Sequence, residues 1–466
     1  MVSTAATTLL NGSPVWLQNL AISAYGWQLR HLRYGGEFGR FRAELDRSDR
    51  YTASELADLQ TRLLRTMLTH AVSTVPYYQQ HCAFQPARFS SMNAQEMLAA
   101  FPILPKSGLR ATPGQFIAQT ATDTVGIQTS GSTGSPLQIT TTRTAIQHNY
   151  AFFARFLGWH GVSPFDESAT FAGRLFGASG RGRNTPWRRN AAMHDTLFSS
   201  YNLSEENLPS YIRELERRQP VFIDSYPSSV YRVASFLKSR GQPHRIRPRL
   251  IVTSSETLLD FQRHTIEEVF GCPVRDQYGS AEMAGFFAEC EHGRYHVAPE
   301  YGFVEIIDAD GAPVPTGETG ELCLTGLINP AMPLIRYLIG DVGRLSDTHC
   351  ACGRHAQVVE SIEGRTDDVI ITPSGRHVGR LDPAFKGVTG IHESQILQTA
   401  RDQVVVRVVS RDPSQVNSAA LIGNLQERIG TDVRISIEFV DSIDKEANGK
   451  FRSVKSLLPR DQTARR

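Results

Sequence analysis

The composition of the chain is that of an ordinary globular protein with a large core. Of its 466 residues, 40% are hydrophobic and 21% are charged, and the formal net charge is +2. This charge predicts no strong attraction to nucleic acid, and no apolar run is long enough to cross a bilayer. The length predicts more than one domain.

The number of cysteines and the N-terminal segment indicate the cellular compartment in which the protein works. Six cysteines in a chain this long are too few for a disulfide scaffold. The segment 9–29 contains Gly and Pro and has no basic start, so we expect no secretory signal. A reduced, cytoplasmic setting is the expectation.

Helix-like and strand-like segments alternate through much of the chain. Leucines at helical spacing predict a helix from Ser54 to Val72. Further along, two helical runs within 207–240 flank the strand-like stretch Val221–Ser229. A short strand, a helix and a strand with a turn follow, at Arg249–Glu256, Phe261–Gly271 and Val274–Ser280. Such alternation predicts an α/β fold with parallel-type sheets, which bind ligands at the carboxyl ends of their strands.

Three other regions differ from this alternating pattern in composition or in predicted secondary structure. The basic, Gly-rich segment Gly173–Arg189 predicts a mobile surface loop rather than a nucleic-acid patch. Short strands and Gly/Pro turns from Gly302 to Leu327 predict a β-rich subdomain. After residue 364, a strand, a helix and a strand predict a small α+β domain of about a hundred residues; they are Val404–Ser410, Asn417–Gly430 and Val433–Val440.

A polar, Gly-containing segment is the most informative motif. TSGSTGSP, from Thr129 to Pro136, combines five hydroxyl residues with two glycines between strand-like flanks. Glycine permits close approach of the backbone to a ligand, and successive N–H groups can bind a phosphate. A Gly/Ser hairpin turn explains the same letters. The segment alone does not decide between a phosphate loop and a turn.

Three downstream motifs complete a pattern: DQYGSAE (276–282), RYLIGD (336–341) and KEANGKFRS (445–453). In order and approximate spacing the four motifs resemble the adenylate-forming superfamily of acyl- and aryl-CoA synthetases, luciferases and nonribosomal adenylation domains. GETGEL, NPAMPLIRY, CACGR and GRTDDVI, with FKGVTGIHESQILQ (385–398), are similar to the phenylacetate-CoA ligase, coenzyme F390 synthetase and CapK-like branch.

The resemblance implies a large N-terminal adenylation domain, 1–364, and a small mobile C-terminal domain, 365–466, that rotates about a hinge at Asp367. It also implies ATP and Mg²⁺ as cofactors. The implied nucleotide-binding residues are Thr129, Ser130, Gly131, Ser132, Thr133, Gly134, Ser255, Glu256, Tyr278, Gly279, Ser280, Asp341 and Arg365. The chain has Ser135 where many relatives carry a lysine, which removes one positive charge from the loop.

Specific roles follow from the chemistry of that reaction, in which a carboxylate attacks the α-phosphate of ATP. Tyr278 is expected to stack on adenine, Glu282 to bind Mg²⁺, and Asp341 to accept the ribose hydroxyls. Lys450 is the expected catalytic residue, because an ammonium can bridge the carboxylate and the α-phosphate where charge develops. Tyr226 and Ser228 are the candidate acyl-substrate residues.

A second candidate site is a structural zinc centre. Cys290, His296, Cys350 and Cys352 offer the thiolate and imidazole ligands that suit tetrahedral Zn²⁺. His292 is an equally good candidate on sequence, and reduced cysteines without metal are the alternative.

We therefore expect an AMP-forming ligase that activates a carboxylic acid, aromatic by resemblance, and passes the acyl group to CoA. Transfer to an amine or a carrier protein is the close alternative, and a non-catalytic nucleotide-binding relative a remote one. A kinase is disfavoured because the loop lacks the G-x-x-x-x-G-K-[ST] arrangement. The oligomeric state stays open, a homodimer included.

Overall fold

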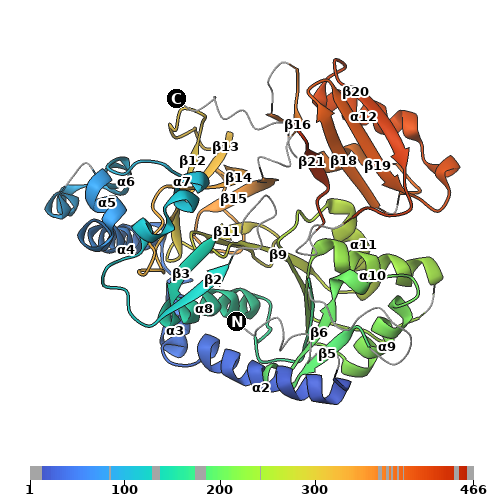
Figure 1. Ribbon diagram of the computed structural model, residues 1–466, viewed down its shortest axis with the longest axis horizontal. Coiled ribbons are helices and arrows are strands. Elements are labelled where there is room, and N and C mark those ends of the chain that lie inside the picture. The colour runs from blue at the N-terminus through green and yellow to red at the C-terminus, as the bar shows by residue number, and fades with distance from the viewer. Residues whose placement is uncertain are drawn as a thin grey trace.

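The structure, a computed structural model, consists of a large body and a smaller C-terminal body (Figure 1). It describes residues 13–82, 85–128, 137–173, 185–241, 243–365, 370–373, 377–378, 381–385, 388–391, 393–444 and 451–458. A 13-stranded mixed sheet runs through the large body, and a four-stranded sheet forms the small one.

The parallel half of the large sheet has the order β9-β8-β7-β4-β6, with β5 antiparallel at its edge. These strands are β4 Ser168–Ala172, β5 Trp187–Asn190, β6 Asp195–Ser199, β7 Phe222–Ser225, β8 Leu250–Ser254 and β9 Val274–Gly279. Their central residues are buried on both faces, as parallel strands require.

Helices cover both faces of this half. On one face lie α9 Leu208–Arg218, α10 Pro227–Arg240 and α11 Asp260–Phe270, whose apolar residues share a core with Ile223 and Ile251. On the other lie α3 Phe38–Ser48 and α8 Arg143–Trp159, which pack on Phe222 and Leu250. The helix α2 Val15–Tyr34 packs along α8 and β5.

The other half of the sheet is largely antiparallel. Its strands are β10 Phe286–Glu289, β11 Tyr295–Val297, β12 Gly302–Ile307, β13 Thr319–Gly326, β14 Tyr337–Leu345 and β15 Val358–Arg365, and β1 Leu104–Pro105 runs parallel to β14. The stretch expected to be β-rich, 302–327, supplies β12 and β13, which belong to the main sheet.

An N-terminal group of helices packs against β12–β14. These are α4 Ala53–Thr74, α5 Pro76–His81, α6 Ala94–Ala99 and α7 Lys106–Ala111. A capping box between Thr52 and Glu55 fixes the start of α4. Among the described helices, none combines the length and apolarity that crossing a membrane requires.

The strands β2 Thr124–Gln128 and β3 Gln138–Thr142 form a separate antiparallel pair in which Gln128 lies opposite Gln138. The expected phosphate loop, Thr129–Gly134, connects these two strands and lies outside the described residues. Shorter 3₁₀ segments are η1 Pro86–Ser91, η2 Pro113–Phe116, η3 Ala191–Met193, η4 Ser200–Asn202, η6 Asp382–Phe385 and η7 Pro413–Gln415.

The small body is α+β, as the sequence predicts. Its sheet has the order β20-β19-β18-β21, formed by β18 Glu393–Ala400, β19 Gln403–Val409, β20 Arg434–Phe439 and β21 Val454–Ser456. The helix α12 Ser418–Ile429 packs on this sheet, and a two-stranded ladder joins β16 Ile370–Ile371 to β17 His377–Val378.

One sequence expectation is wrong in part. The basic segment 173–189 is not entirely a surface loop, because Arg188 lies in β5, is fully buried, and donates to Gln18 Oε1 at 2.6 Å and to the Thr185 carbonyl. Near the N-terminus, the helix α2 continues through Gly26. Gly26 fits there since an added Cβ would lie 2.1 Å from the Asn190 side chain.

Candidate active site and metal centre

Tyr278 and Asp341 meet across the sheet although they lie on different strands. Tyr278 Oη donates to Asp341 Oδ2 at 2.5 Å, and its ring stacks on Phe287 with centroids 4.9 Å apart. In the ladder β14–β15 the Cα partner of Asp341 is Arg365. The fold therefore brings together three residues that the sequence assigns to adenine and ribose, and Asp341 lies within a strand rather than at a helix start.

Glu282 follows β9 and is buried beside a cation. Its Oε1 accepts from Lys106 Nζ at 2.9 Å and from Tyr337 Oη at 3.2 Å, and its side chain is only 5% exposed. Burial acts to raise the pKa of Glu282, but Lys106 and Tyr337 more than offset it, so the pKa lies below its usual value. Glu282 is therefore a carboxylate at neutral pH. Lys106 and Tyr337 are site residues that sequence reasoning missed.

Positive φ angles at non-glycine residues mark this site. Met283, directly after Glu282, has φ 53°, and Arg336, directly before Tyr337, has φ 47°. Such conformations cost free energy and persist where surrounding structure imposes them, often at functional sites. Between Tyr278 and Glu282, Ser280 Oγ is buried and has no hydrogen-bond partner within the described part of the chain. A hydroxyl in that state is suited to a ligand group.

Glu256 lies at the end of β8 and reaches two other segments. Its Oε2 accepts from the Ser228 backbone N–H at 3.0 Å, and its Oε1 accepts from Ser228 Oγ at 3.1 Å and from the Phe451 N–H at 2.6 Å. Ser255, just before it, is exposed and has φ 72°. The expected acyl residue Tyr226 is the N-cap residue of α10, and burial raises its pKa.

Several expected residues cannot be placed. Asp367 and Lys450, like the phosphate loop, lie outside the described residues, and of Arg365 only the backbone is described. Gly279 ends β9, next to Ser280. Phe451, which follows Lys450 in sequence, is described and contacts Glu256.

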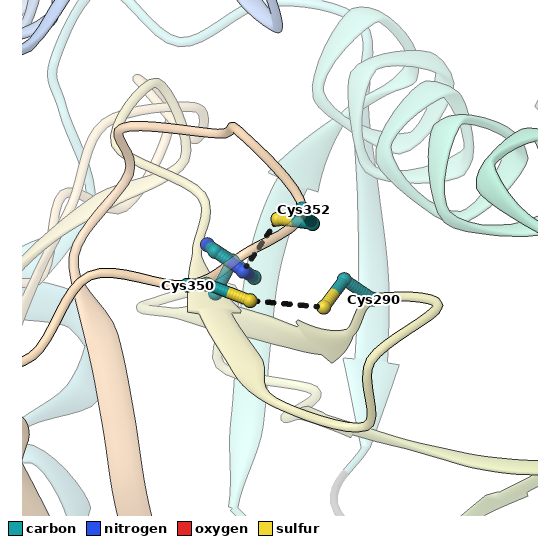
Figure 2. A group of neighbouring side chains, drawn as sticks. Cys290, Cys350 and Cys352 are labelled. Carbon is teal, nitrogen blue, oxygen red and sulfur yellow. Dashed lines mark hydrogen bonds between the residues drawn. The ribbon is translucent and has the colours of Figure 1, made fainter.

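The four expected metal ligands form one cluster. The ligand atoms of Cys290, His296, Cys350 and Cys352 all lie within 4.8 Å of one another. Cys290 Sγ lies 3.6 Å from Cys350 Sγ, and Cys352 Sγ lies 3.3 Å from His296 Nε2. Figure 2 shows the side chains of Cys290 and Cys350 pointing toward each other. The cysteines are free thiols, and two thiolates bound to one tetrahedral Zn²⁺ are about 3.8 Å apart.

The histidine of the cluster is in the correct state for a ligand. Its Nδ1 lies 3.3 Å from the Ala356 carbonyl, so this nitrogen donates there and Nε2 faces the sulfur atoms. Burial lowers the pKa of His296 to about 4, which keeps the imidazole neutral at pH 7. The outer hydrogen bond is the kind that orients metal-bound histidines. His292, the sequence alternative, is exposed and not among the clustered residues.

Comparisons with known proteins find relatives over nearly the whole chain. Residues 370–457 match the family model of the CapK C-terminal domain. Protein CapK of Staphylococcus aureus is 26% identical over 457 residues, covering 95% of this chain and 98% of that protein. These similarities support a place in the adenylate-forming superfamily, in its CapK and phenylacetate-CoA ligase-like branch.

Two further similarities concern the branch and the fold. The phenylacetate-coenzyme A ligase of Pseudomonas putida is 29% identical over 338 residues, covering 71% of this chain and 75% of that enzyme. A 2-hydroxyisobutyryl-CoA ligase in its postadenylation state has a TM-score of 0.71 at 21% identity, covering 89% of this chain and 92% of that one. An open conformation of the same ligase scores 0.58. The fold of this chain is thus that of the adenylate-forming ligases.

Proposed function

We propose that this member of the adenylate-forming superfamily is an AMP-forming ligase that activates a carboxylic acid with ATP and transfers the acyl group to CoA. In the first half-reaction a carboxylate oxygen attacks the α-phosphorus and pyrophosphate leaves. In the second, the CoA sulfur attacks the acyl carbon and AMP leaves. The observation that carries the proposal is the pairing of Tyr278 with Asp341 beside the buried carboxylate of Glu282.

The residues of the site have complementary tasks in this chemistry. Tyr278 is an aromatic platform for adenine, with its hydroxyl held by Asp341. Asp341 is suited to accept ribose hydroxyls, and the backbone of Thr129–Gly134 is assigned to the β- and γ-phosphates. Glu282 is the carboxylate proposed for Mg²⁺, which binds carboxylates together with phosphate oxygens. Lys106 and Tyr337 both donate to Oε1 of this carboxylate.

The substrate class and the acceptor are part of the proposal. The similarity to the phenylacetate-coenzyme A ligase of Pseudomonas putida supports an aromatic acid and CoA. Tyr226 and Ser228, at the start of α10, are proposed to line the acyl pocket. We also propose that the chain divides into two domains after residue 364 and that the small domain rotates about a hinge at Asp367. The free thiols favour a cytoplasmic setting.

We also propose that Cys290, His296, Cys350 and Cys352 hold one structural Zn²⁺. The support is the chemistry of the donor set and its spacing within 4.8 Å. Three sulfur atoms and one imidazole complete a tetrahedral shell, so no position remains for a water or substrate. The ion would connect the β10–β11 turn with the segment between β14 and β15.

A product analysis tests the proposed reaction. The protein is incubated with ATP, Mg²⁺, CoA and each member of a panel of aromatic and aliphatic carboxylates, and the products are identified by mass spectrometry. We expect AMP, pyrophosphate and an acyl-CoA in equal amounts for at least one aromatic acid. Stoichiometric formation of ADP would contradict the proposed reaction. If added amines gave an amide and CoA gave no thioester, the acyl acceptor would be an amine and not CoA.

A further inference from the structure

The side chain of Glu256 connects the large body to the small one. It accepts from the Ser228 N–H and Oγ, both on α10 in the large body, and from the N–H of Phe451 at 2.6 Å. Phe451 belongs to the small body, where Gln395 Nε2 donates to the carbonyl of the next residue, Arg452, at 2.9 Å, and the chain then enters β21. One carboxylate therefore holds both bodies.

Two local features stabilise the Glu256 carboxylate in the position from which it contacts Ser228 and Phe451. Ser228 is in the first turn of the 14-residue helix α10, where N–H groups lack partners within the helix and the field attracts a negative charge. Ser255 has φ 72°, a conformation that is strained for a non-glycine residue. Ser255 directly precedes Glu256, so the strained backbone conformation helps to set the position of the Glu256 carboxylate.

Two ion pairs also join the large body to the small body. Arg232, one turn after Ser228 on α10, pairs with Glu393 of β18 at 2.6 Å. Glu205 pairs with Arg411 at 2.8 Å, and both of these side chains are about 60% exposed. Exposed pairs such as Glu205–Arg411 contribute little, whereas the half-buried Glu256 contacts the Phe451 segment itself from the large body.

We propose that Glu256 is a positioning residue that docks the segment carrying Lys450 for the adenylation half-reaction, rather than an adenine contact. The inference rests on the proposed function. Lys450 directly precedes Phe451 in the sequence, so fixing the Phe451 N–H limits where the lysine can reach. Rotation of the small body for thioester formation would break this bond. Loss of Glu256 should then slow the first half-reaction and spare the second.

Glu256→Gln tests this role at constant size. A carboxylate accepts from Ser228 N, Ser228 Oγ and Phe451 N together, whereas an amide has one acceptor oxygen and a donor group that opposes an N–H. We expect kcat of ATP–pyrophosphate exchange to fall about ten- to hundredfold, the factor of one charge-assisted hydrogen bond, with little change in the KM for ATP. Thioester formation from a supplied acyl-adenylate should keep the wild-type rate.

Glu205→Gln is the matched control, since it also removes a carboxylate that contacts the small body, and we expect both half-reactions to stay at wild-type rates. A raised KM for ATP with unchanged kcat in Glu256→Gln would assign the residue to nucleotide binding and overturn the proposal. An equal loss in both half-reactions would indicate a merely structural role and also overturn it.

A measurement without turnover separates this inference from the proposed function. Hydrogen exchange of the Phe451 amide should be slow in the wild-type protein and at least about tenfold faster in Glu256→Gln, with the amides of β18 and β19 unchanged. Unchanged exchange at Phe451 would overturn the docking role. If the wild-type protein formed no adenylate with any acid, the proposed function would fail, while this exchange result would still decide whether Glu256 docks Phe451.

Discussion

Tyr278 and Asp341, 63 residues apart in sequence, are joined by a 2.5 Å hydrogen bond from the phenol Oη to Oδ2. The bond connects the end of β9 to the middle of β14, so the aromatic platform and the carboxylate are fixed relative to each other. Phe287 supports the other side of the platform by stacking at 4.9 Å. The residues proposed for nucleotide recognition are therefore preorganised by strands of the main sheet.

The first prediction concerns Asp341. Asp341→Ala removes the acceptor assigned to two ribose hydroxyls, and two hydrogen bonds to a charged group correspond to about 3 kcal/mol. We expect kcat/KM for ATP in pyrophosphate exchange to fall about hundredfold, largely through KM. Tyr278→Phe, which retains the ring and loses only the hydroxyl, should show a smaller loss. Equal values for Asp341→Ala and the wild-type protein would remove Asp341 from the nucleotide site.

The second prediction concerns the buried pair Lys106–Glu282. Lys106→Met leaves the Glu282 carboxylate without its cation, and breaking a buried pair costs about 3–5 kcal/mol. Because Lys106 is 31% exposed, we expect a smaller loss of unfolding free energy at pH 7. The pKa of Glu282 is lowered in the wild-type protein, so this stabilisation is present above the usual carboxyl pKa and is lost as pH falls.

Urea denaturation at pH 7 and pH 4.5 measures this difference. Lys106→Met should be more destabilising at pH 7, where Glu282 is charged in the unfolded chain and poorly accommodated in the fold. Lys238→Met, which removes an exposed lysine paired with Glu268, is the control and should change stability little at either pH. An equal loss at both pH values would mean that Lys106 stabilises the protein by packing alone.

The sequence predicted the alternating part of the fold and the grouping of four Cys and His residues, for physical reasons. Periodicity identified α4, α11 and the strands β7 and β8, because their burial patterns repeat locally. The four candidate ligands could be chosen because metal chemistry restricts residue types, and the structure brings their side chains together. The structure also shows that His296, and not His292, lies in this cluster, a choice that sequence spacing could not make.

Other features depend on contacts between distant segments. Lys106 lies in no motif, and it is near Glu282 only because β1 pairs with β14. Arg188 looks like a surface residue by composition, and its burial depends on Gln18 of α2. The bond from Phe451 to Glu256 joins residues that are 195 positions apart. Local patterns contain no information about such pairs.

The third prediction is a pH dependence of stability at Asp276. Burial, with the nearby Glu289, raises the pKa of Asp276 to about 7. The folded state therefore keeps a proton that the unfolded state releases near pH 4, so this residue's stabilising contribution declines as pH rises from about 4 to 7. Asp276→Asn should flatten the decline of melting temperature over that range. Parallel profiles for variant and wild-type protein would contradict the raised pKa.

The fourth prediction concerns the proposed zinc centre. Purified protein should contain about one zinc per chain, and Cys350→Ser or Cys352→Ser should lower both metal content and melting temperature, because the ion joins two segments that are distant in sequence. Cys82→Ser, at a half-buried cysteine outside the cluster, is the control and should retain the metal. Fully stable, active protein without metal by elemental analysis would exclude the site.

The central claim is tested most directly by carboxylate-dependent ATP–pyrophosphate exchange, measured for the wild-type protein and for Lys450→Ala. The account predicts exchange with Mg²⁺ and at least one carboxylate, and a rate lower by about two to three decades in the variant, because a charge at the developing phosphoryl transition state is worth a few kcal/mol. Exchange in Lys450→Ala at the wild-type rate, or no exchange in the wild-type protein with any acid of the panel, would contradict it.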